Sequence, residues 1–109
     1  MLILFDQGTP RGIARTLIGH TVKEARVEGW DTLANGALLS AAEAAGFDVF
    51  LTTDKNIPYQ QNLSQRKIAV VVLGKSRWRL IRPKLAEIAA AVNAATPGSF
   101  TLVEIPERI

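Results

Sequence analysis

The sequence predicts an α/β fold, a three-layer α/β/α sandwich built on a mainly parallel five-stranded sheet. Short apolar runs without polar alternation recur along the chain, as is typical of strands buried on both faces. Segments with apolar residues at helical spacing separate these runs. Because strand and helix alternate, we expect right-handed crossovers and helices on both faces of the sheet. A length of 109 residues predicts one domain over 1–109.

The predicted elements are strand 1–5, helix 10–18, strand 20–25, helix 36–45, strand 48–52, strand 68–73, a helix from 78–82 to about 95, and strand 100–105. The strand over 68–73 reads Ile-Ala-Val-Val-Val-Leu and is expected to be central, because it is uncharged and rich in β-branched residues. The strand over 1–5 is also a continuous apolar run. Lys23 and Glu24 indicate that the strand over 20–25 lies at an edge.

Caps and breakers indicate the helix boundaries. Thr9 and Pro10 supply a capping hydroxyl followed by a proline suited to the first helical position. Asn35 is expected to cap the helix that follows it. Pro83 fits only the first turn of the last helix. The apolar stripe of that helix recurs at steps of four, three and four residues, at Ile81, Leu85, Ile88 and Val92.

Composition excludes several classes of protein and site. Without cysteine the chain has no disulfide and no thiolate metal site, and with one histidine it has no multi-histidine zinc site. No apolar run approaches the length of about 18 residues that a membrane-spanning helix needs. The first residues lack the basic flank and the long apolar segment of a signal peptide. We therefore expect a cytoplasmic protein that does not span a membrane.

Two acidic residues follow predicted strands. Asp6 ends the first apolar run, and Asp54 follows the strand over 48–52. Ligand sites of parallel sheets lie at the carboxyl ends of the strands, so Asp6 and Asp54 are candidate catalytic residues and candidate ligands of one Mg²⁺ or Mn²⁺ ion. Such an ion would ready water for attack on a phosphodiester. The alternative is that both are turn-forming aspartates.

Residues near these strand ends are candidate contacts for RNA. They are Lys55, Asn56, Tyr59, Gln60, Gln61, Lys75, Arg77 and Arg79. An aromatic ring beside amides suits a nucleotide, and the basic run, which continues to Lys84 without an acid, suits phosphate. Alternatively, the amides hold the loop and the basic residues form a solvated surface. Trp30 and Trp78 are expected to be packing residues rather than platforms for bases.

Several motifs together resemble a known family. They are Asp6-Gln7-Gly8-Thr9-Pro10, Gly19-His20-Thr21-Val22, Gly29-Trp30, Asn35-Gly36, Gly46-Phe47-Asp48-Val49, Thr53-Asp54-Lys55-Asn56 and Tyr59-Gln60-Gln61-Asn62. These motifs look like the small PIN-like proteins of the DUF5615 type, similar to the toxins of VapBC-class toxin–antitoxin pairs. The resemblance covers nearly the whole chain. It implies a Mg²⁺- or Mn²⁺-dependent ribonuclease whose metal-binding acids include Asp6 and Asp54. RNA and a cognate antitoxin are the implied partners, and a homodimer is a further assembly to consider.

One position departs from this family pattern. Relatives usually carry Asp or Glu after Asn-Gly, where this chain has Ala37. The resemblance implies that this acid completes the metal site, so its absence is expected to weaken metal binding. Two interpretations stay open: a ribonuclease that Ala37 weakens or inactivates, and a non-catalytic PIN-like module that binds RNA or protein. A receiver domain phosphorylated on Asp54 is disfavoured, because Gln7 follows Asp6 and Glu104 stands where a lysine is usual.

Overall fold

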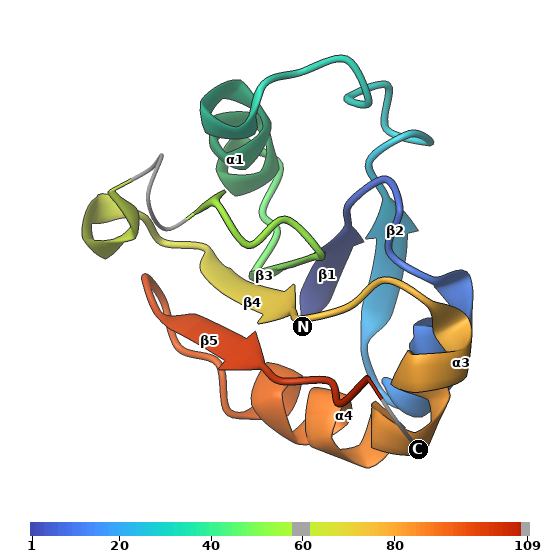
Figure 1. The fold of residues 1–109 in the computed structure, drawn as a ribbon. Coiled ribbons are helices and arrows are strands. Elements are labelled where there is room, and N and C mark those ends of the chain that lie inside the picture. Colours follow the sequence, from blue (N-terminus) through green and yellow to red (C-terminus); the bar gives the residue numbers. More distant parts are fainter. Residues whose placement is uncertain (58–61, 108–109) are drawn as a thin grey trace.

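The computed structural model describes residues 1–57 and 62–107 and contains one all-parallel sheet (Figure 1). The strands are β1 (Leu2–Phe5), β2 (Thr21–Glu24), β3 (Val49–Thr52), β4 (Ala69–Leu73) and β5 (Phe100–Val103), in the order β2-β1-β3-β4-β5. The α-helices are α1 (Asn35–Ala44), α3 (Trp78–Ile81) and α4 (Leu85–Asn93), and the 3-10 segments are η1 (Arg11–Thr16), η2 (Leu63–Gln65) and η3 (Arg82–Lys84). The predicted α/β fold with five strands is confirmed.

Helical segments cover both faces of the sheet and produce two hydrophobic cores. On one face, Leu39 of α1 packs in a cluster with Phe50 of β3. On the other face, Ile13 of η1 and Ile88 of α4 pack in a cluster with Val71 of β4. Figure 1 shows α1 on one side of the strands and α3 and α4 on the other. Successive side chains of each strand alternate between the two cores, which gives the three layers that the sequence predicts.

The first helical segment differs from its prediction. It is a 3-10 helix of six residues, and Pro10 precedes it instead of occupying its first position. Thr9 is buried, and its hydroxyl donates a 3.1 Å hydrogen bond to the carbonyl oxygen of Leu51. The hydroxyl therefore ties the turn after β1 to β3, and it is not used as a helix cap.

The last predicted helix is divided at Pro83. The helix α3 ends at Ile81, η3 contains Pro83, and α4 begins at Leu85. Because proline has no N–H, the α-helical hydrogen bond is lost at this residue, and the chain takes the tighter 3-10 conformation. The apolar stripe is nevertheless confirmed, since Ile81 and Ile88 are fully buried in one core.

The crossover from β4 to β5 has the opposite hand from the other three. The β2–β3 and β3–β4 connections lie on the face of α1, and the β1–β2 connection lies on the face of η1. The β4–β5 connection moves across the sheet in the same direction as β3–β4 but covers the face of η1, so its hand is reversed. Right-handed crossovers are nearly universal, and the prediction that all would be right-handed is wrong for this one. The six-residue η1 is too short to cover its face of the sheet, and α3 and α4 complete that layer.

The edges of the sheet are β2, as predicted, and β5. Phe100 and Leu102 of β5 remain 40% and 45% exposed, because α4 lies on the opposite face of the strand. No helix among the described residues is both long enough and apolar enough to cross a membrane.

Candidate carboxylate site and basic pocket

Asp6 and Asp54 lie at the point where the direction of chain progress across the sheet reverses. From β1 the chain passes to β2 on one side, and β3 then pairs with the other side of β1. Crevices at such switch points are the usual ligand sites of open α/β sheets. The N–H of Asp6 donates a 3.0 Å hydrogen bond to the carbonyl oxygen of Leu51, which extends the β1–β3 pairing by one residue. Since Phe5 pairs with Leu51, Asp6 lies beside Thr52.

The hydroxyl of Thr52 connects the two acidic residues. It donates a 2.7 Å hydrogen bond to Oδ2 of Asp6 and accepts a 3.0 Å hydrogen bond from the N–H of Asp54. Thr52 is fully buried as the last residue of β3. No role for Thr52 is predicted from the sequence. The available signal was a hydroxyl at the end of an otherwise apolar strand, two residues before an aspartate.

Asn35 contributes to the site instead of capping α1. It is the first residue of the helix, and Ala34 in the N-cap position makes no side-chain hydrogen bond. Nδ2 of Asn35 donates a 3.0 Å hydrogen bond to Oδ2 of Asp54. The other oxygen of Asp54 accepts a 2.9 Å hydrogen bond from the N–H of Asn56. The predicted capping role is wrong, because a side chain in the first helical residue lies beyond the cap position and reaches the nearby carboxylate.

The Asp6–Asp54 pair carries negative charge in a partly buried place. Burial raises the pKa of the Asp6 carboxyl group above its ordinary value, and the charge of Asp54 raises it further. Hydrogen bonds from Thr52 and from the N–H of Gln7 act in the opposite direction. Within the described part of the chain, no lysine, arginine or histidine forms an ion pair with either carboxylate. A cation between the two would relieve both the burial cost and the repulsion.

The donor chemistry fits Mg²⁺ or Mn²⁺, which take carboxylate oxygens and often bind through one or two carboxylates, several waters and substrate phosphates. Among residues 1–57 and 62–107, no group of three or more His, Cys, Asp or Glu side chains comes together. Ala37 lies in the first turn of α1 with its side chain exposed. The described part of the chain therefore offers two acidic ligands, and a metal ion here would depend on water and phosphate for the rest of its coordination.

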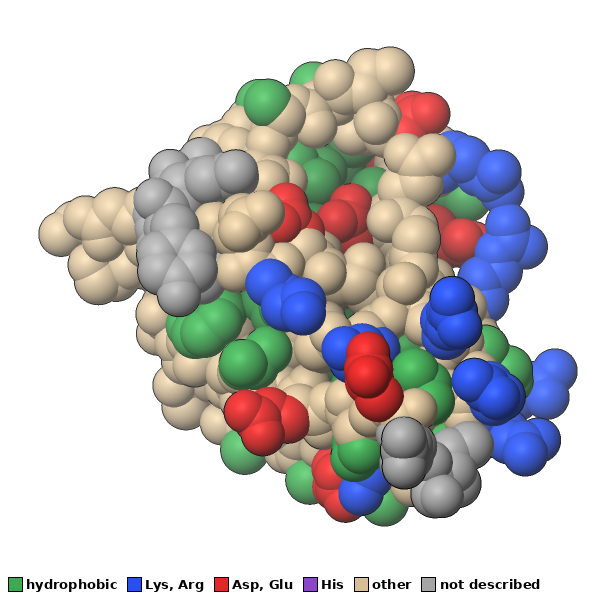
Figure 2. Space-filling view, in the orientation of Figure 1, with side chains coloured by type: hydrophobic (Ala, Val, Ile, Leu, Met, Phe, Trp, Pro, Cys, Tyr) green, Lys and Arg blue, Asp and Glu red, His purple; other side chains and the backbone are tan. Residues whose placement is uncertain are grey.

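A basic pocket adjoins the carboxylates. Its volume is about 570 Å³, and it is lined by Thr53, Lys55, Gly74, Lys75, Ser76, Arg77, Arg79, Leu80 and Glu107. Thr53 and Lys55 flank Asp54 in the chain, so the pocket begins beside the carboxylate site. Glu107 neutralises Lys75 only in part, because the contact between them is 3.4 Å long and the Glu107 side chain is largely exposed. Figure 2 shows acidic side chains near the centre of this face with Lys and Arg side chains gathered below and to one side of them.

The structure brings together four of the predicted RNA contacts, namely Lys55, Lys75, Arg77 and Arg79. Asn56 is exposed and does not line the pocket; its N–H closes the turn on Asp54 instead. Tyr59, Gln60 and Gln61 lie outside the described residues.

Comparison of the chain with protein-family models, curated proteins and solved structures gives no match.

Proposed function

We propose that this chain is a metal-dependent ribonuclease of the PIN-like toxin type, which cleaves RNA phosphodiester bonds. The observation that carries the proposal is a pair of partly buried carboxylates with no described cationic partner, beside a pocket lined by Lys55, Lys75, Arg77 and Arg79. Two acids attract a divalent cation, and the adjoining basic residues attract phosphate. A metal-dependent nuclease needs a cation site and a phosphate-binding site next to each other.

Each residue has a distinct part in this proposal. Asp6 and Asp54 would hold Mg²⁺ or Mn²⁺, and such an ion would supply an activated water and stabilise the charge that develops on phosphate. Thr52 and Asn35 position the carboxylates through hydrogen bonds of 2.7 and 3.0 Å. The basic pocket would hold the RNA backbone next to the pair, so that phosphate oxygens could add to the two acidic ligands that the described residues offer.

A non-catalytic module that binds RNA or protein is the second candidate. It is favoured because no third acid joins the pair in a metal-binding group among the described residues, and because position 37 is an exposed alanine. In both cases the proposed partners are RNA and a cognate antitoxin, the proposed assembly to check is a homodimer, and the proposed location is the cytoplasm.

Calorimetric titration with Mn²⁺, with and without RNA, separates the two candidates. The ribonuclease proposal expects Mn²⁺ binding that strengthens when RNA is present, loss of that binding in Asp6→Asn and Asp54→Asn, and cleavage of RNA only with metal. Metal binding with uncut RNA would favour the non-catalytic module. No binding at millimolar Mn²⁺ together with uncut RNA would sink the ribonuclease proposal.

Position 37 provides a gain-of-function test. We expect Ala37→Glu to increase Mn²⁺ affinity and RNA cleavage, because a third carboxylate would further neutralise the ion. Ala37→Gln is the matched control, since it adds a side chain of the same length without charge. If the two variants bind Mn²⁺ equally well, position 37 does not belong to the metal site.

The basic pocket is tested by charge reversal. Arg79→Glu should weaken RNA binding and reduce the slope of log affinity against log salt by about 0.7 for one lost phosphate contact. Lys67→Glu is the control, because Lys67 is exposed just before β4, at the amino edge of the sheet. Equal effects of the two reversals would mean that the pocket is not the RNA contact.

A further inference from the structure

Trp78 is a large aromatic residue exposed among basic residues. Its exposed fraction is 40%. By contrast, Trp30 packs edge-to-face on Phe47 with 5.8 Å between ring centroids. From the sequence, both tryptophans are expected to be packing residues; Trp78 does pack, against Gly12 of η1, but 40% of it remains exposed.

The indole ring of Trp78 is supported by the backbone of Gly12 in η1. A methyl group on Gly12 would stand 2.4 Å from Cη2 of Trp78, so only a residue without a side chain leaves room for the ring. Gly12 is not among the glycines with positive φ, and its backbone does not itself require glycine. The ring is therefore held from one side by η1, while 40% of the residue remains exposed to a ligand, as a preformed stacking surface requires.

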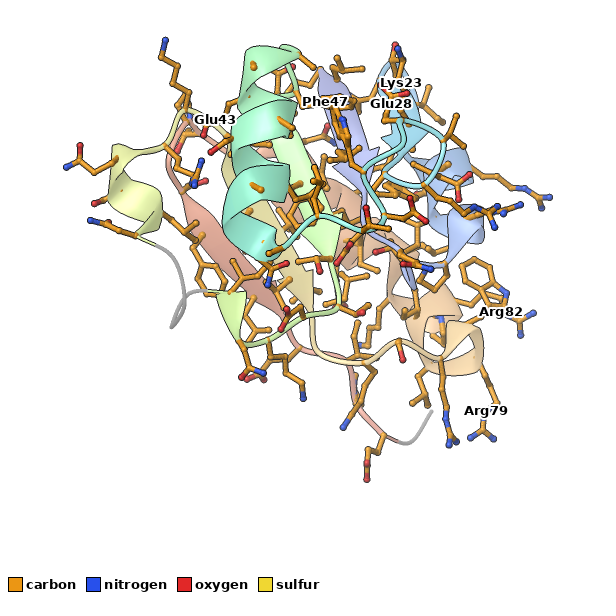
Figure 3. The ribbon with its side chains drawn as sticks, turned by 90° about the horizontal axis from the view of Figure 1, so that it is seen from above. Lys23, Glu28, Glu43, Phe47, Arg79 and Arg82 are labelled. Atoms are coloured by element: carbon orange, nitrogen blue, oxygen red, sulfur yellow. The ribbon has the colours of Figure 1, made fainter. Side chains whose placement is uncertain are left out.

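Three exposed arginines lie close to Trp78 in the chain. Arg77 and Arg79 are its chain neighbours, and Arg82 lies one helical turn further on, on the same face as Trp78. None of the three forms an ion pair with a described residue. Figure 3 shows the side chains of Arg79 and Arg82 projecting outward from the α3 region on the same side of the molecule. Guanidinium groups without acidic partners are suited to contact phosphate.

The arginines connect Trp78 to the carboxylate site. Arg77 and Arg79 line the same basic pocket as Thr53 and Lys55, which flank Asp54. Basic residues of the pocket therefore lie between the segment of Asp54 and the surface of α3. Exposed aromatic rings beside such basic residues are the recurring feature of proteins that bind single-stranded nucleic acid.

We propose that Trp78 is a stacking platform for a base of single-stranded RNA whose backbone follows these basic residues from the carboxylate pair across α3. The proposal rests on the RNA-binding part of the proposed function, and it does not depend on metal binding or cleavage. It assigns RNA in preference to an acidic peptide, because acidic side chains would use the arginines and leave the ring without a partner. In RNA, the phosphates would contact the arginines and a base would stack on the ring of Trp78.

The test compares two RNA oligomers about 12 nucleotides long, oligouridine and an abasic oligomer with the same backbone, in EDTA so that no cleavage occurs. Trp78→Leu should weaken oligouridine binding by about 5- to 150-fold and leave abasic binding nearly unchanged. Trp78→Phe should keep most of the affinity, since it retains a ring. Unchanged oligouridine affinity in Trp78→Leu, or equal losses for both oligomers, would overturn the proposal.

A second measurement does not depend on how well Trp78→Leu folds. In Trp30→Phe, Trp78 is the only tryptophan, and its fluorescence should be quenched by oligouridine but not by the abasic oligomer. Equal quenching by an acidic peptide, or none by oligouridine that binds, would overturn the platform. If the unaltered protein binds neither oligomer at low salt, the RNA-binding part of the proposed function fails as well, which is a distinct result.

Discussion

The hydroxyl of Thr52 donates a 2.7 Å hydrogen bond to Oδ2 of Asp6, and the register of the sheet places these residues side by side. Phe5 pairs with Leu51, so the next residue of each strand meets at the carboxyl edge. The same hydroxyl accepts a hydrogen bond from the N–H of Asp54. One buried hydroxyl therefore links the carboxylate of Asp6 to the backbone of Asp54, whose own carboxylate is held by Asn35 and the N–H of Asn56.

Replacing Thr52 with valine should disturb the site without changing the shape of the core. Thr52→Val removes the donor to Asp6 and the acceptor for the Asp54 N–H, which should cost about 1–3 kcal/mol of unfolding free energy. The pKa of Asp6 should rise further, because the hydrogen bond from Thr52 lowers it. Thr52→Ser is the control that keeps the hydroxyl. Urea unfolding and an NMR titration of Asp6 check both effects, and an equal pKa in the two variants would contradict them.

The raised pKa of Asp6 predicts how stability depends on pH. Burial is the main cause of the shift, so the folded state binds this proton more tightly than the unfolded state does. The contribution of Asp6 to stability therefore falls as pH rises from the ordinary carboxyl pKa through the raised one. The Asn side chain of Asp6→Asn does not titrate. The unfolding free energy of this variant minus that of the unaltered protein should therefore increase across that pH window and then level off. Urea unfolding between about pH 3.5 and 7 measures the difference, and a decrease would contradict the sign.

Added Mg²⁺ or Mn²⁺ should oppose the loss of stability that Asp6 causes as pH rises, because these ions bind the deprotonated carboxylate. Mn²⁺ affinity is expected to rise with pH as Asp6 loses its proton. Calorimetry in buffers of different ionisation enthalpy would reveal the proton released on binding. If proton release persists in Asp6→Asn, the released proton comes from a group other than Asp6.

The sequence contains enough information for the fold class and for the pair of acids. Runs such as Ala69–Leu73 are buried at every position, and this pattern specifies a parallel strand covered on both faces. Asp6 and Asp54 follow such runs, so the rule for strand ends brings them to one edge. The hydrogen-bond partners of the two acids could not be predicted in this way. The contact of Thr52 with Asp6 depends on strand register, which no local sequence pattern reveals.

The hand of the last crossover also lies beyond local patterns. It depends on which face of the sheet is left uncovered once η1 and α1 are in place. The chain over 10–18 has the composition of a longer helix, but only Arg11–Thr16 is helical, and Thr9 bonds to Leu51 instead of capping it. The shortness of η1 and the position of α4 are therefore consequences of tertiary packing, as is the exposure of Phe100 on β5.

The ion pair between Glu43 and Arg66 should stabilise the attachment of α1 to the segment before β4. Oε1 of Glu43 lies 2.6 Å from Nη1 of Arg66, and Oε2 accepts a 2.6 Å hydrogen bond from the N–H of Lys67. Burial opposes ionisation of Glu43, but these hydrogen bonds and the charge of Arg66 outweigh it and lower its pKa. Glu43→Gln should therefore cost roughly 1–2 kcal/mol of unfolding free energy at neutral pH.

The pH dependence of this variant has the opposite sign to that of Asp6. A lowered pKa stabilises the fold above the ordinary carboxyl pKa, and that stabilisation is lost as pH falls through the folded value. The difference between Glu43→Gln and the unaltered protein should therefore shrink in acid. Glu87→Gln, which breaks the exposed contact with Lys84, should cost less than about 0.5 kcal/mol. Equal losses in the two glutamine variants would contradict the assigned role of Glu43.

Gly12→Ala tests whether the Trp78 ring lies where the proposed platform requires. Alanine normally stabilises a helical segment by about 0.5–1 kcal/mol relative to glycine. Here the added methyl would stand 2.4 Å from Cη2 of Trp78, so the ring must move, and we expect a net loss of roughly 1 kcal/mol with a change in tryptophan emission. In a Trp78→Leu background the same change should become neutral or stabilising. This double-mutant cycle, followed by urea unfolding, isolates the contact between Gly12 and Trp78. If Gly12→Ala still lowers the unfolding free energy in the Trp78→Leu background, the strain lies in the backbone of η1, and Gly12 does not support the ring.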